Sequence, residues 1–253
     1  MANVITQKIP TIPKAGGIRI VPLGDIHIGA AACDEDHFRR TVKYIKDEGA
    51  YWIGMGDYCD FINKSDKRFN VSALADWIGI KELGDLAKNQ ERRFLEIVNP
   101  IASRCLGLLM GNHEGTILQK YERDIYSNIV TGIKEAGGMK DTDRLAVGYS
   151  GWLRLRFDRK SSNSRRQIMV YLHHGFVGGK LAGAKALNMQ RLLWNHEADL
   201  IIMGHSHNTS IQREAVEYVN DSDQIAIRNK LGCYSGTYLK TNHEGTTTYS
   251  EVK

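Results

Sequence analysis

Five short apolar runs recur along the chain, and each ends in Asp, Asn or His residues, in most cases directly after a glycine. Runs of four to eight apolar residues bounded by glycine are typical of buried strands. The five segments, each taken with its polar end, are 18–27, 51–60, 105–114, 168–175 and 199–207. The pattern therefore predicts five buried strands with polar chemistry at their carboxyl ends.

Helical periodicity fills much of the space between these runs. Apolar residues at helical spacing predict helices over 34–49, 88–102, 116–138 and 185–198, and Pro100 is expected to bend or end the second of them. Glycines close the first and third of these segments, as they often do at helix ends. Strands that alternate with helices favour a layered α/β fold.

The pattern changes after His207. Segments 211–219, 224–239 and 246–252 are rich in β-formers and separated by turn residues, which predicts antiparallel strands. Segment 153–174 alternates on both sides of a Ser/Asn turn, as a hairpin does. We therefore predict an α/β (α+β) fold, a β-sandwich flanked by helices, in a single domain over 18–253. Residues 1–17 are expected to form an extended tail, and 61–90 either a cap over the site or a plain connecting helix pair.

Composition narrows the class of protein only slightly. The 253 residues are 42% hydrophobic and 25% charged, which predicts a packed core, and the net charge of +5 permits a polyanionic partner without requiring one. The four cysteines form no Cys-x-x-Cys pair, so reduced thiols and a cytoplasmic setting are expected. The first residues lack the apolar stretch of a signal peptide, and no run approaches the ~18 apolar residues that a membrane span needs.

The polar strand ends carry metal-ligand chemistry. Ligands of α/β sheets sit at the carboxyl ends of the strands, where this chain has Asp25, His27, Asp57, Asn112, His173, His205 and His207. One tetrahedral zinc ion needs only four ligands and favours Cys and His. A set of carboxylate, amide and imidazole groups this large instead suits two ions that share one carboxylate, with manganese, iron, zinc or nickel as candidates. Two such ions ~3.5–4 Å apart form a clamp for phosphoryl chemistry.

The motifs GDIH, GDYCD, GNHE, a histidine after the fourth strand, and GHSH follow one another from Asp25 to His207. In this order they resemble the calcineurin-like metallophosphoesterase family, which implies a four-layer β-sandwich and two divalent metal ions, with manganese as first choice. The resemblance implies that Asp25, His27 and His207 hold the first ion, that Asn112, His173 and His205 hold the second, and that Asp57 bridges them.

The resemblance also implies the catalytic roles. A hydroxide held by the metal ions would attack in line with the leaving oxygen, and His113 would stabilise or protonate that oxygen. Asp60 would orient the His113 ring and support its charged form. Of the two adjacent histidines, His173 occupies the usual family position directly after the strand, so His174 is expected to turn away from the metals.

Departures from the family's protein Ser/Thr phosphatase branch guide the choice of substrate. Phe61 follows Asp60 where that branch has Arg, and the first motif reads GDIHIG, without a glycine directly after His27. These features favour a phosphodiesterase or nuclease acting on nucleic acid or a nucleotide. Lys180 and Lys185, in a glycine-rich segment, are expected to contact the phosphate. A phosphomonoesterase and a non-catalytic binding scaffold remain alternatives, and the sequence does not fix the oligomeric state.

Overall fold

The computed structural model describes residues 3–9, 17–157, 166–176 and 181–240, and within them the strands form two sheets. The six-stranded sheet has the order β1-β6-β7-β8-β10-β9. Its strands are β1 (Asn3–Ile9), β6 (Ser150–Phe157), β7 (Arg166–His173), β8 (Leu200–Met203), β9 (Thr209–Val219) and β10 (Ile225–Ser235). The four-stranded sheet is parallel and consists, in order, of β2 (Ile20–Leu23), β3 (Tyr51–Gly54), β4 (Cys105–Leu109) and β5 (Ala146–Gly148).

The two sheets pack face to face. Successive residues of a strand point to opposite faces, so each sheet directs one set of its side chains toward the other sheet. Ile53, Leu106 and Leu109 of the four-stranded sheet share one buried cluster with Val170, Leu172 and Ile202 of the six-stranded sheet. Parallel pairing of β7 with β8 aligns His173 with Met203, so these two strands end side by side. The carboxyl ends of both sheets therefore meet in the region where the expected ligands lie.

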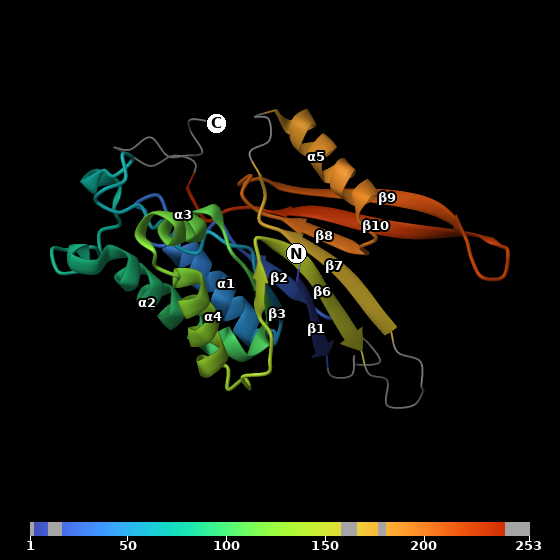
Figure 1. Cartoon of the computed structure of the whole chain (residues 1–253), viewed down its shortest axis with the longest axis horizontal. Helices are drawn as coiled ribbons and strands as arrows, with labels where there is room; N and C mark the ends of the chain where they lie inside the picture. Colours follow the sequence, from blue (N-terminus) through green and yellow to red (C-terminus); the bar gives the residue numbers. More distant parts are fainter. Residues whose placement is uncertain (1–2, 10–16, 158–165, 177–180, 241–253) are drawn as a thin grey trace.

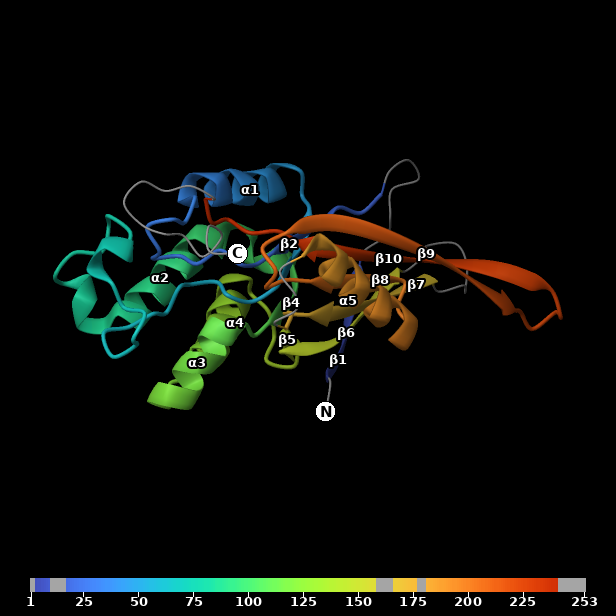
Figure 2. The ribbon, with the colours of Figure 1, turned by 90° about the horizontal axis from the view of Figure 1, so that it is seen from above.

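Helices cover the outer faces of both sheets (Figures 1 and 2). The α-helices are α1 (Glu35–Asp47), α2 (Leu86–Val98), α3 (Asn112–Tyr121), α4 (Ile125–Ala136) and α5 (Ala182–Asn195). The short 3-10 helices are η1 (Val71–Ala73), η2 (Glu82–Asp85) and η3 (Asn99–Arg104). α1, α2 and α4 pack on the four-stranded sheet, and α5 packs on the six-stranded sheet. The predicted sandwich flanked by helices is confirmed.

Local sequence explains where most helices begin and end. The side chain of Asp34 caps α1 by accepting a hydrogen bond from the His37 amide, and Phe38, Val42 and Ile45 follow on one buried face. α2 ends at Val98, just before Pro100, and the chain continues as the 3-10 helix η3. The predicted helices over 34–49, 88–102 and 185–198 correspond to α1, α2 and α5, within a few residues at their ends.

The single helix predicted over 116–138 is wrong, because the chain forms two helices there. α3 begins earlier, at Asn112, and ends at Tyr121, and Glu122 adopts a left-handed conformation with φ of 53°. α4 then begins after Asp124, whose side chain accepts hydrogen bonds from the amide and hydroxyl of Ser127. Apolar residues continue at helical spacing through both helices, so the periodicity alone did not reveal the break.

The expected N-terminal tail is also corrected. Residues 3–9 form β1, which pairs in parallel with β6 and buries Ile5 and Ile9 in the sandwich core. The expected hairpin over 153–174 is present as the antiparallel pair β6 and β7. Its turn, residues 10–16 of the expected tail and the predicted strand over 246–252 lie outside the described residues.

Segment 61–90 contains the two short 3-10 helices η1 and η2 and then the start of α2, rather than a plain connecting helix pair. None of the helices in the described ranges combines the length and apolar character that crossing a membrane would require. The four cysteines are free thiols, as expected, and burial raises the pKa of the Cys33 thiol to about 12.

Candidate metal centre

The candidate site is a cluster of side chains from the loops that follow β2, β3, β4, β7 and β8. Three groups of side chains each place their ligand atoms within 4.8 Å of one another. The groups are Asp25, His27 and His207; His27, Asp57 and His113; and Asp57, His174 and His205. Because His27 and Asp57 each belong to two groups, the cluster is continuous, and Asp57 lies in the middle of it.

The backbone at these residues is strained in a recurring way. Asp25, His27, Asp57, His205 and His207 all have positive φ, between 49° and 62°. Non-glycine residues rarely adopt this left-handed region, which costs of the order of 1–2 kcal/mol each. Five such residues in one cluster mark a functional site, because the surrounding fold must hold each of them in place.

Hydrogen bonds between loops supply that support. The Asp25 amide donates to the Gly56 carbonyl, and the His27 amide donates to the Asp57 carbonyl. The His205 amide donates to Oδ2 of Asp25 at 2.8 Å, which joins the loop after β8 to the loop after β2. Three ligand loops from two sheets are therefore tied together by contacts that do not require a metal ion.

The C-terminal part of the described chain also supports the first ligand loop. After β10, the chain returns to the Asp25 carbonyl, which accepts hydrogen bonds from the Tyr238 amide at 3.0 Å and from the Thr237 hydroxyl at 2.8 Å. The Asp34 amide in turn donates to the Tyr238 carbonyl. The loop that carries Asp25 and His27 is thus held by the segment after β10 as well as by the loop after β3.

Two glycines allow the loops to approach this closely. A Cβ at Gly111 would lie 2.2 Å from Oδ1 of Asp57. Gly56 has φ of 90°, and a Cβ there would lie 2.7 Å from Nδ1 of His174. A side chain at either position would displace a residue of the cluster, which explains why glycine follows these strands.

Opposite charges stabilise one another inside the cluster. Burial alone would raise the pKa of Asp57, but His113, His174 and His27 outweigh it and hold the pKa well below its usual range. Burial alone would lower the pKa of His174, but the Asp57 carboxylate raises it to about 9. The pKa of His27 is raised in the same way, because Asp60, Asp57 and Asp25 outweigh its burial. The carboxylates of the cluster thus stabilise positive charge beside them, which is the charge that a bound cation would supply.

The donor atoms fit divalent metal ions. Oδ1 of Asp25 and both ring nitrogens of His27 are buried and make no hydrogen bond within the part of the chain that the structure describes. A buried polar atom without a hydrogen bond is costly, and coordination to a cation would remove that cost. Mixed carboxylate and imidazole donors suit manganese, iron, zinc and nickel, without selecting among them.

The structure brings His174, rather than His173, into the cluster. Nε2 of His174 lies 3.0 Å from Oδ1 of Asn112 and 3.3 Å from Oδ2 of Asp57, and Nδ1 contacts the Met55 carbonyl. His173 lies on the other face of the sheet, near Tyr171, and its Nδ1 accepts a hydrogen bond from the Gly175 amide. The expectation that His173 faces the metals and His174 turns away is reversed by this geometry.

Strand alternation is the physical reason for the reversal. Val170 and Leu172 point into the core between the sheets, whereas Tyr171 points toward α5. His174 continues the inward series and His173 continues the outward one. Val170 and Leu172 are buried at alternate positions of β7, and His174 is the next position in that series. This spacing is therefore the sequence signal that could have identified His174.

His113 and Asp60 lie together, but not as expected. Nδ1 of His113 contacts the main-chain carbonyl of Asp60, not its carboxylate. The Asp60 carboxylate instead faces His27, with Oδ1 3.6 Å from Nδ1 of that ring, slightly beyond a hydrogen bond. Asp60 thus contacts both histidines, one through its backbone and one through its side chain.

Glu114 is a site residue that the sequence reading missed. Its carboxylate is fully buried and accepts three backbone hydrogen bonds, from Asp57 at 3.0 Å, Tyr58 at 2.9 Å and Gly111 at 2.8 Å. Burial and the neighbouring Asp57 raise its pKa. A glutamate three residues after a glycine that ends a strand is a capping-box position, and that signal was available in GNHE.

Of the two lysines expected to contact the phosphate, the structure describes Lys185. Nζ of Lys185, on α5, donates to the carbonyl of Ser206 in the loop between His205 and His207 at 3.4 Å. Lys180 lies outside the described residues. Lys185 therefore contacts the backbone of a ligand loop, and its expected role as a phosphate contact stays a prediction.

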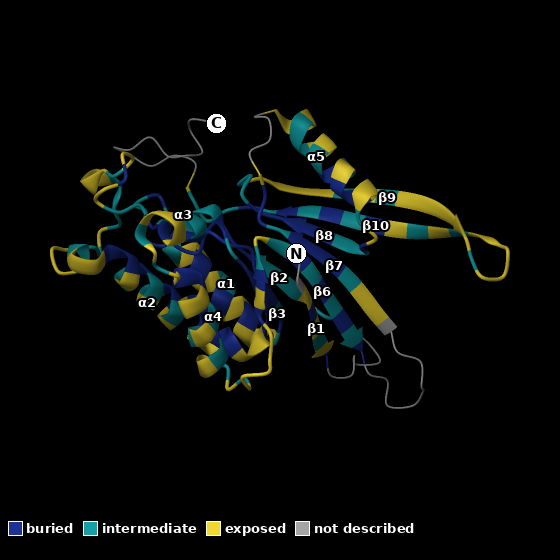
Figure 3. Cartoon of the chain, viewed as in Figure 1, coloured by how far each residue is buried: buried dark blue, intermediate teal, exposed yellow. Residues whose placement is uncertain are grey.

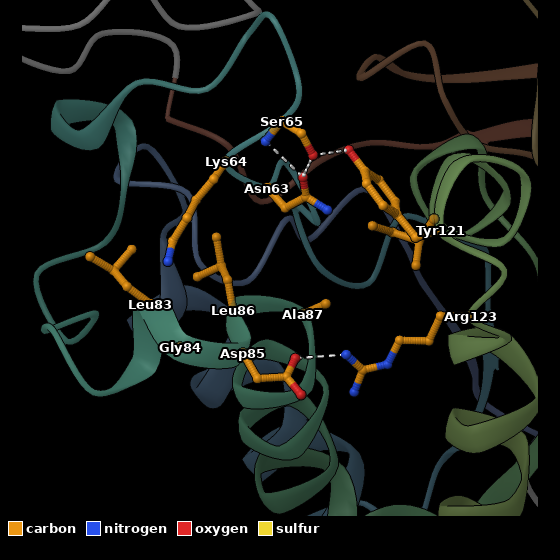
Figure 4. A pocket seen from close by; sticks show the side chains of 11 residues that line it. Asn63, Lys64, Ser65, Leu83, Gly84, Asp85, Leu86, Ala87, Tyr121 and Arg123 are labelled. Carbon is orange, nitrogen blue, oxygen red and sulfur yellow. Dashed lines mark hydrogen bonds and ion pairs between the residues drawn. The ribbon is translucent and has the colours of Figure 1, made fainter.

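A cavity of about 410 Å³ separates part of segment 61–90 from the C-terminal half of α3 (Figure 4). Ser65 contacts the Tyr121 hydroxyl across it, and Arg123 pairs with Asp85 at 2.6 Å. α3 begins at Asn112 in the metal cluster, so one helix connects the cluster with this cavity. Whether segment 61–90 caps the site stays a prediction.

Comparison with known proteins identifies a family whose matched region contains the whole cluster. Residues 18–209 match the family model of the calcineurin-like phosphoesterases. The matched region begins just before β2 and includes every residue of the cluster. No curated protein matches the chain.

Proposed function

The chain belongs to the calcineurin-like phosphoesterase family, a group of metal-dependent hydrolases of phosphoester bonds, and on that premise we propose that it is a phosphodiesterase with two metal ions. One observation carries the proposal. The cluster is continuous through Asp57, with Asp25, His27 and His207 on one side of it and His174 and His205 on the other. A single shared carboxylate between two ligand groups is the arrangement expected of a two-metal site.

The assignment of ligands follows this geometry. Asp25, His27 and His207 would hold the first ion, and Asp57 would be shared. Asn112, His174 and His205 would hold the second, with Oδ1 of Asn112 already 3.0 Å from the His174 ring. We favour manganese as the ion, with iron, zinc and nickel as alternatives.

Two ions bound in this way would supply a nucleophile from water at neutral pH and neutralise charge on the phosphate oxygens. The chain's own residues do the rest. The main-chain carbonyl of Asp60 fixes the His113 ring through Nδ1, which leaves Nε2 for the substrate. From that atom, His113 would donate a proton to the leaving oxygen. Asp60 would position His27 through its carboxylate, and Glu114 would position the backbone of Asp57.

The preference for a diester rests on what lies beside the cluster. A phosphomonoester carries more negative charge than a diester, and an arginine after Asp60 would help to bind it. Phe61 occupies that position, is buried, and donates its amide to Gln90. The net charge of +5 is compatible with nucleic acid or a nucleotide as the diester. We therefore favour those substrates, and a phosphomonoesterase is the main alternative.

The first experiment compares hydrolysis of bis-p-nitrophenyl phosphate with that of p-nitrophenyl phosphate. The full chain is assayed with Mn²⁺, with chelator, and as the His113→Ala variant at the same metal content. Metal-dependent diester cleavage that falls in the variant supports the proposal, and nucleic acids at varied salt are then tested. Cleavage of the monoester alone would replace the proposal with the phosphatase. Two bound metal ions with no turnover of either compound would favour the scaffold.

A further inference from the structure

Strand β9 is an open edge of the six-stranded sheet. It pairs with β10 along all eleven of its residues, in continuous register, and with no other strand of the described chain. The hairpin of β9 and β10 extends beyond the rest of the fold (Figures 1 and 2). Natural edge strands are usually protected by proline, charged side chains, bulges or shortness; β9 has no proline or bulge and is long, and its charged residues carry both signs.

Hydrogen bonds at the two ends of the hairpin show which backbone groups face the open side. The Asn220 amide donates to the Gln224 carbonyl, and the Gly236 amide donates to the Asn208 carbonyl, both at 3.0 Å. In an antiparallel pair, hydrogen-bonded positions alternate with positions whose amides point away. The even-numbered residues of β9 therefore bond to β10, and the odd-numbered residues direct their amides and carbonyls outward.

The odd-numbered side chains share one face of β9, and their order is symmetric about Ala215. Arg213 and Glu217 flank Ala215 as a basic and an acidic residue, and Ile211 and Val219 flank these as apolar residues. All five residues are exposed, Ile211 at 74% and Val219 at 66% (Figure 3). Two copies of this strand, placed antiparallel to each other, are therefore complementary in charge.

We propose that β9 pairs with β9 of a second copy of this chain, antiparallel and centred on Ala215, so that the two sheets become one. This register places Arg213 opposite Glu217 of the other copy twice, and Ile211 opposite Val219 twice. The contact uses the same surface on both copies and closes on itself, as most homodimer interfaces do. Opposite charges directly across a strand pair are favourable.

The neighbouring registers are less favourable. Centring the pair on Arg213 sets two arginines against each other, and centring it on Glu217 does the same with two glutamates. Centring it on Glu214 also opposes two glutamates. Centring it on Val216 opposes no like charges but loses both pairs of Arg213 with Glu217. The charge pattern therefore favours the register centred on Ala215, which matters because strands without such a pattern slip easily.

Apolar residues of β10 extend the proposed interface. Ile225 lies directly opposite Val219, and Ile227 lies opposite Glu217, on the same face. They are 77% and 63% exposed. In the dimer, Ile211 of one copy would lie beside Val219 and Ile225 of the other, in a row across three strands. α5 packs on the even-numbered face, where Gln190 donates to Glu214, so it leaves the odd-numbered face uncovered.

The experiment measures the molecular mass of the full chain by sedimentation over a range of concentrations. The wild-type chain is expected to dimerise. Arg213→Glu sets four glutamates against one another, and Glu217→Arg does the same with arginines, so each is expected to weaken dimerisation roughly tenfold or more. The double variant R213E/E217R restores both pairs and is expected to dimerise like the wild type.

Mixing the two single variants provides a matched control for folding. A chain with Arg213→Glu and a chain with Glu217→Arg are complementary to each other, so their mixture is expected to form heterodimers. Ala215→Pro removes the outward amide at the centre and is expected to abolish the dimer with an unchanged circular dichroism spectrum. A wild-type monomer at all concentrations, full dimerisation of either single variant or of Ala215→Pro, or a mixture and double variant that stay monomeric would each overturn the proposal.

Discussion

The carboxylate of Glu114 holds the backbone of Asp57, because Oε2 accepts a hydrogen bond from the Asp57 amide at 3.0 Å. The same oxygen accepts from Gly111, and the other oxygen accepts from Tyr58. One buried side chain therefore joins the loop after β3 to the loop after β4. The shared carboxylate of the proposed two-metal site depends on a residue that does not bind metal.

Glu114→Gln is expected to weaken metal binding about tenfold, because the variant replaces one acceptor oxygen with an N–H donor that faces backbone amides. The same substitution should cost about 1–3 kcal/mol of unfolding free energy. Isothermal titration with Mn²⁺ and urea denaturation measure the two effects. Glu96→Gln, on the exposed side of α2, is the control and should change neither. Unchanged metal affinity in Glu114→Gln would show that the loop needs no such support.

His174→Ala is expected to lose one of the two metal ions and at least on the order of a hundredfold in kcat/KM. The expectation follows from the contacts of His174 with Asn112 and Asp57. His173→Ala removes the same residue type one position earlier and is the matched control, because His173 lies on the outer face. Elemental analysis gives the metal content. The reverse outcome, with loss only in His173→Ala, would reinstate the assignment made from sequence.

Asp60→Asn is expected to affect metal affinity more than the rate of the metal-loaded enzyme. The Asp60 carboxylate faces His27, whereas His113 is held by the main-chain carbonyl, which the substitution keeps. We expect metal affinity to fall roughly tenfold and kcat at saturating metal to change little. Kinetics over a metal titration separate the two quantities. A large loss of kcat at full metal occupancy would mean that the carboxylate acts on His113 after all.

The pairing of Glu35 with Arg93 and Arg39 predicts a pH dependence of stability. Burial would raise the pKa of Glu35, but hydrogen bonds from these two arginines outweigh it and lower the pKa from 4.5. A carboxyl group whose pKa falls on folding stabilises the fold above its unfolded pKa, and this stabilisation is lost as pH falls through the folded value. Glu35→Gln should therefore cost about 1 kcal/mol at pH 7.

The difference between wild type and Glu35→Gln should shrink steadily as the pH is lowered below 4.5. Urea denaturation at several pH values tests this. Glu48→Gln removes an exposed ion pair with Arg19 and is the control, with little effect expected at any pH. A Glu35→Gln difference that stays constant with pH would exclude an electrostatic origin.

Glu122→Gly is expected to stabilise the protein by up to about 1 kcal/mol, because Glu122 has φ of 53° at the end of α3 and glycine adopts this conformation without strain. Glu122→Ala keeps a Cβ in the left-handed region and is the matched control, with no gain expected. Thermal unfolding of the three proteins ranks them. Destabilisation by glycine would show that the Glu122 side chain contributes a contact that outweighs the strain.

Much of the fold was predictable because burial acts locally. Strands such as β4 and β8 are short apolar runs that end at glycine, and parallel pairing then brings their polar ends together. The features that could not be predicted from the sequence depend on strand register and on backbone conformation. Periodicity did not reveal the left-handed turn at Glu122, and a residue list did not show that Asp60 contacts His113 through its carbonyl.

The site residues likewise divide into those that could be predicted from a local pattern and those that could not. The residue types of the cluster could be predicted, because Asp, Asn and His residues directly follow the apolar runs. His173 and His174 are adjacent, and they are distinguished only by their position relative to Val170 and Leu172, which point into the core at alternate positions. β1 was missed because its burial depends on pairing with β6, a strand that lies far along the chain. Contacts between distant segments of the chain are the part that a local pattern does not encode.

The hydrogen bonds from Thr237 and Tyr238 to the Asp25 carbonyl have a consequence for the order of events during synthesis. Thr237 is translated 212 residues after Asp25, an interval on the order of ten seconds or more. A nascent chain whose exposed part ends before Thr237 already contains the motifs of the metal cluster, yet its first ligand loop lacks the hydrogen bonds from Thr237 and Tyr238. We therefore expect that tight metal loading follows the synthesis of this segment rather than preceding it.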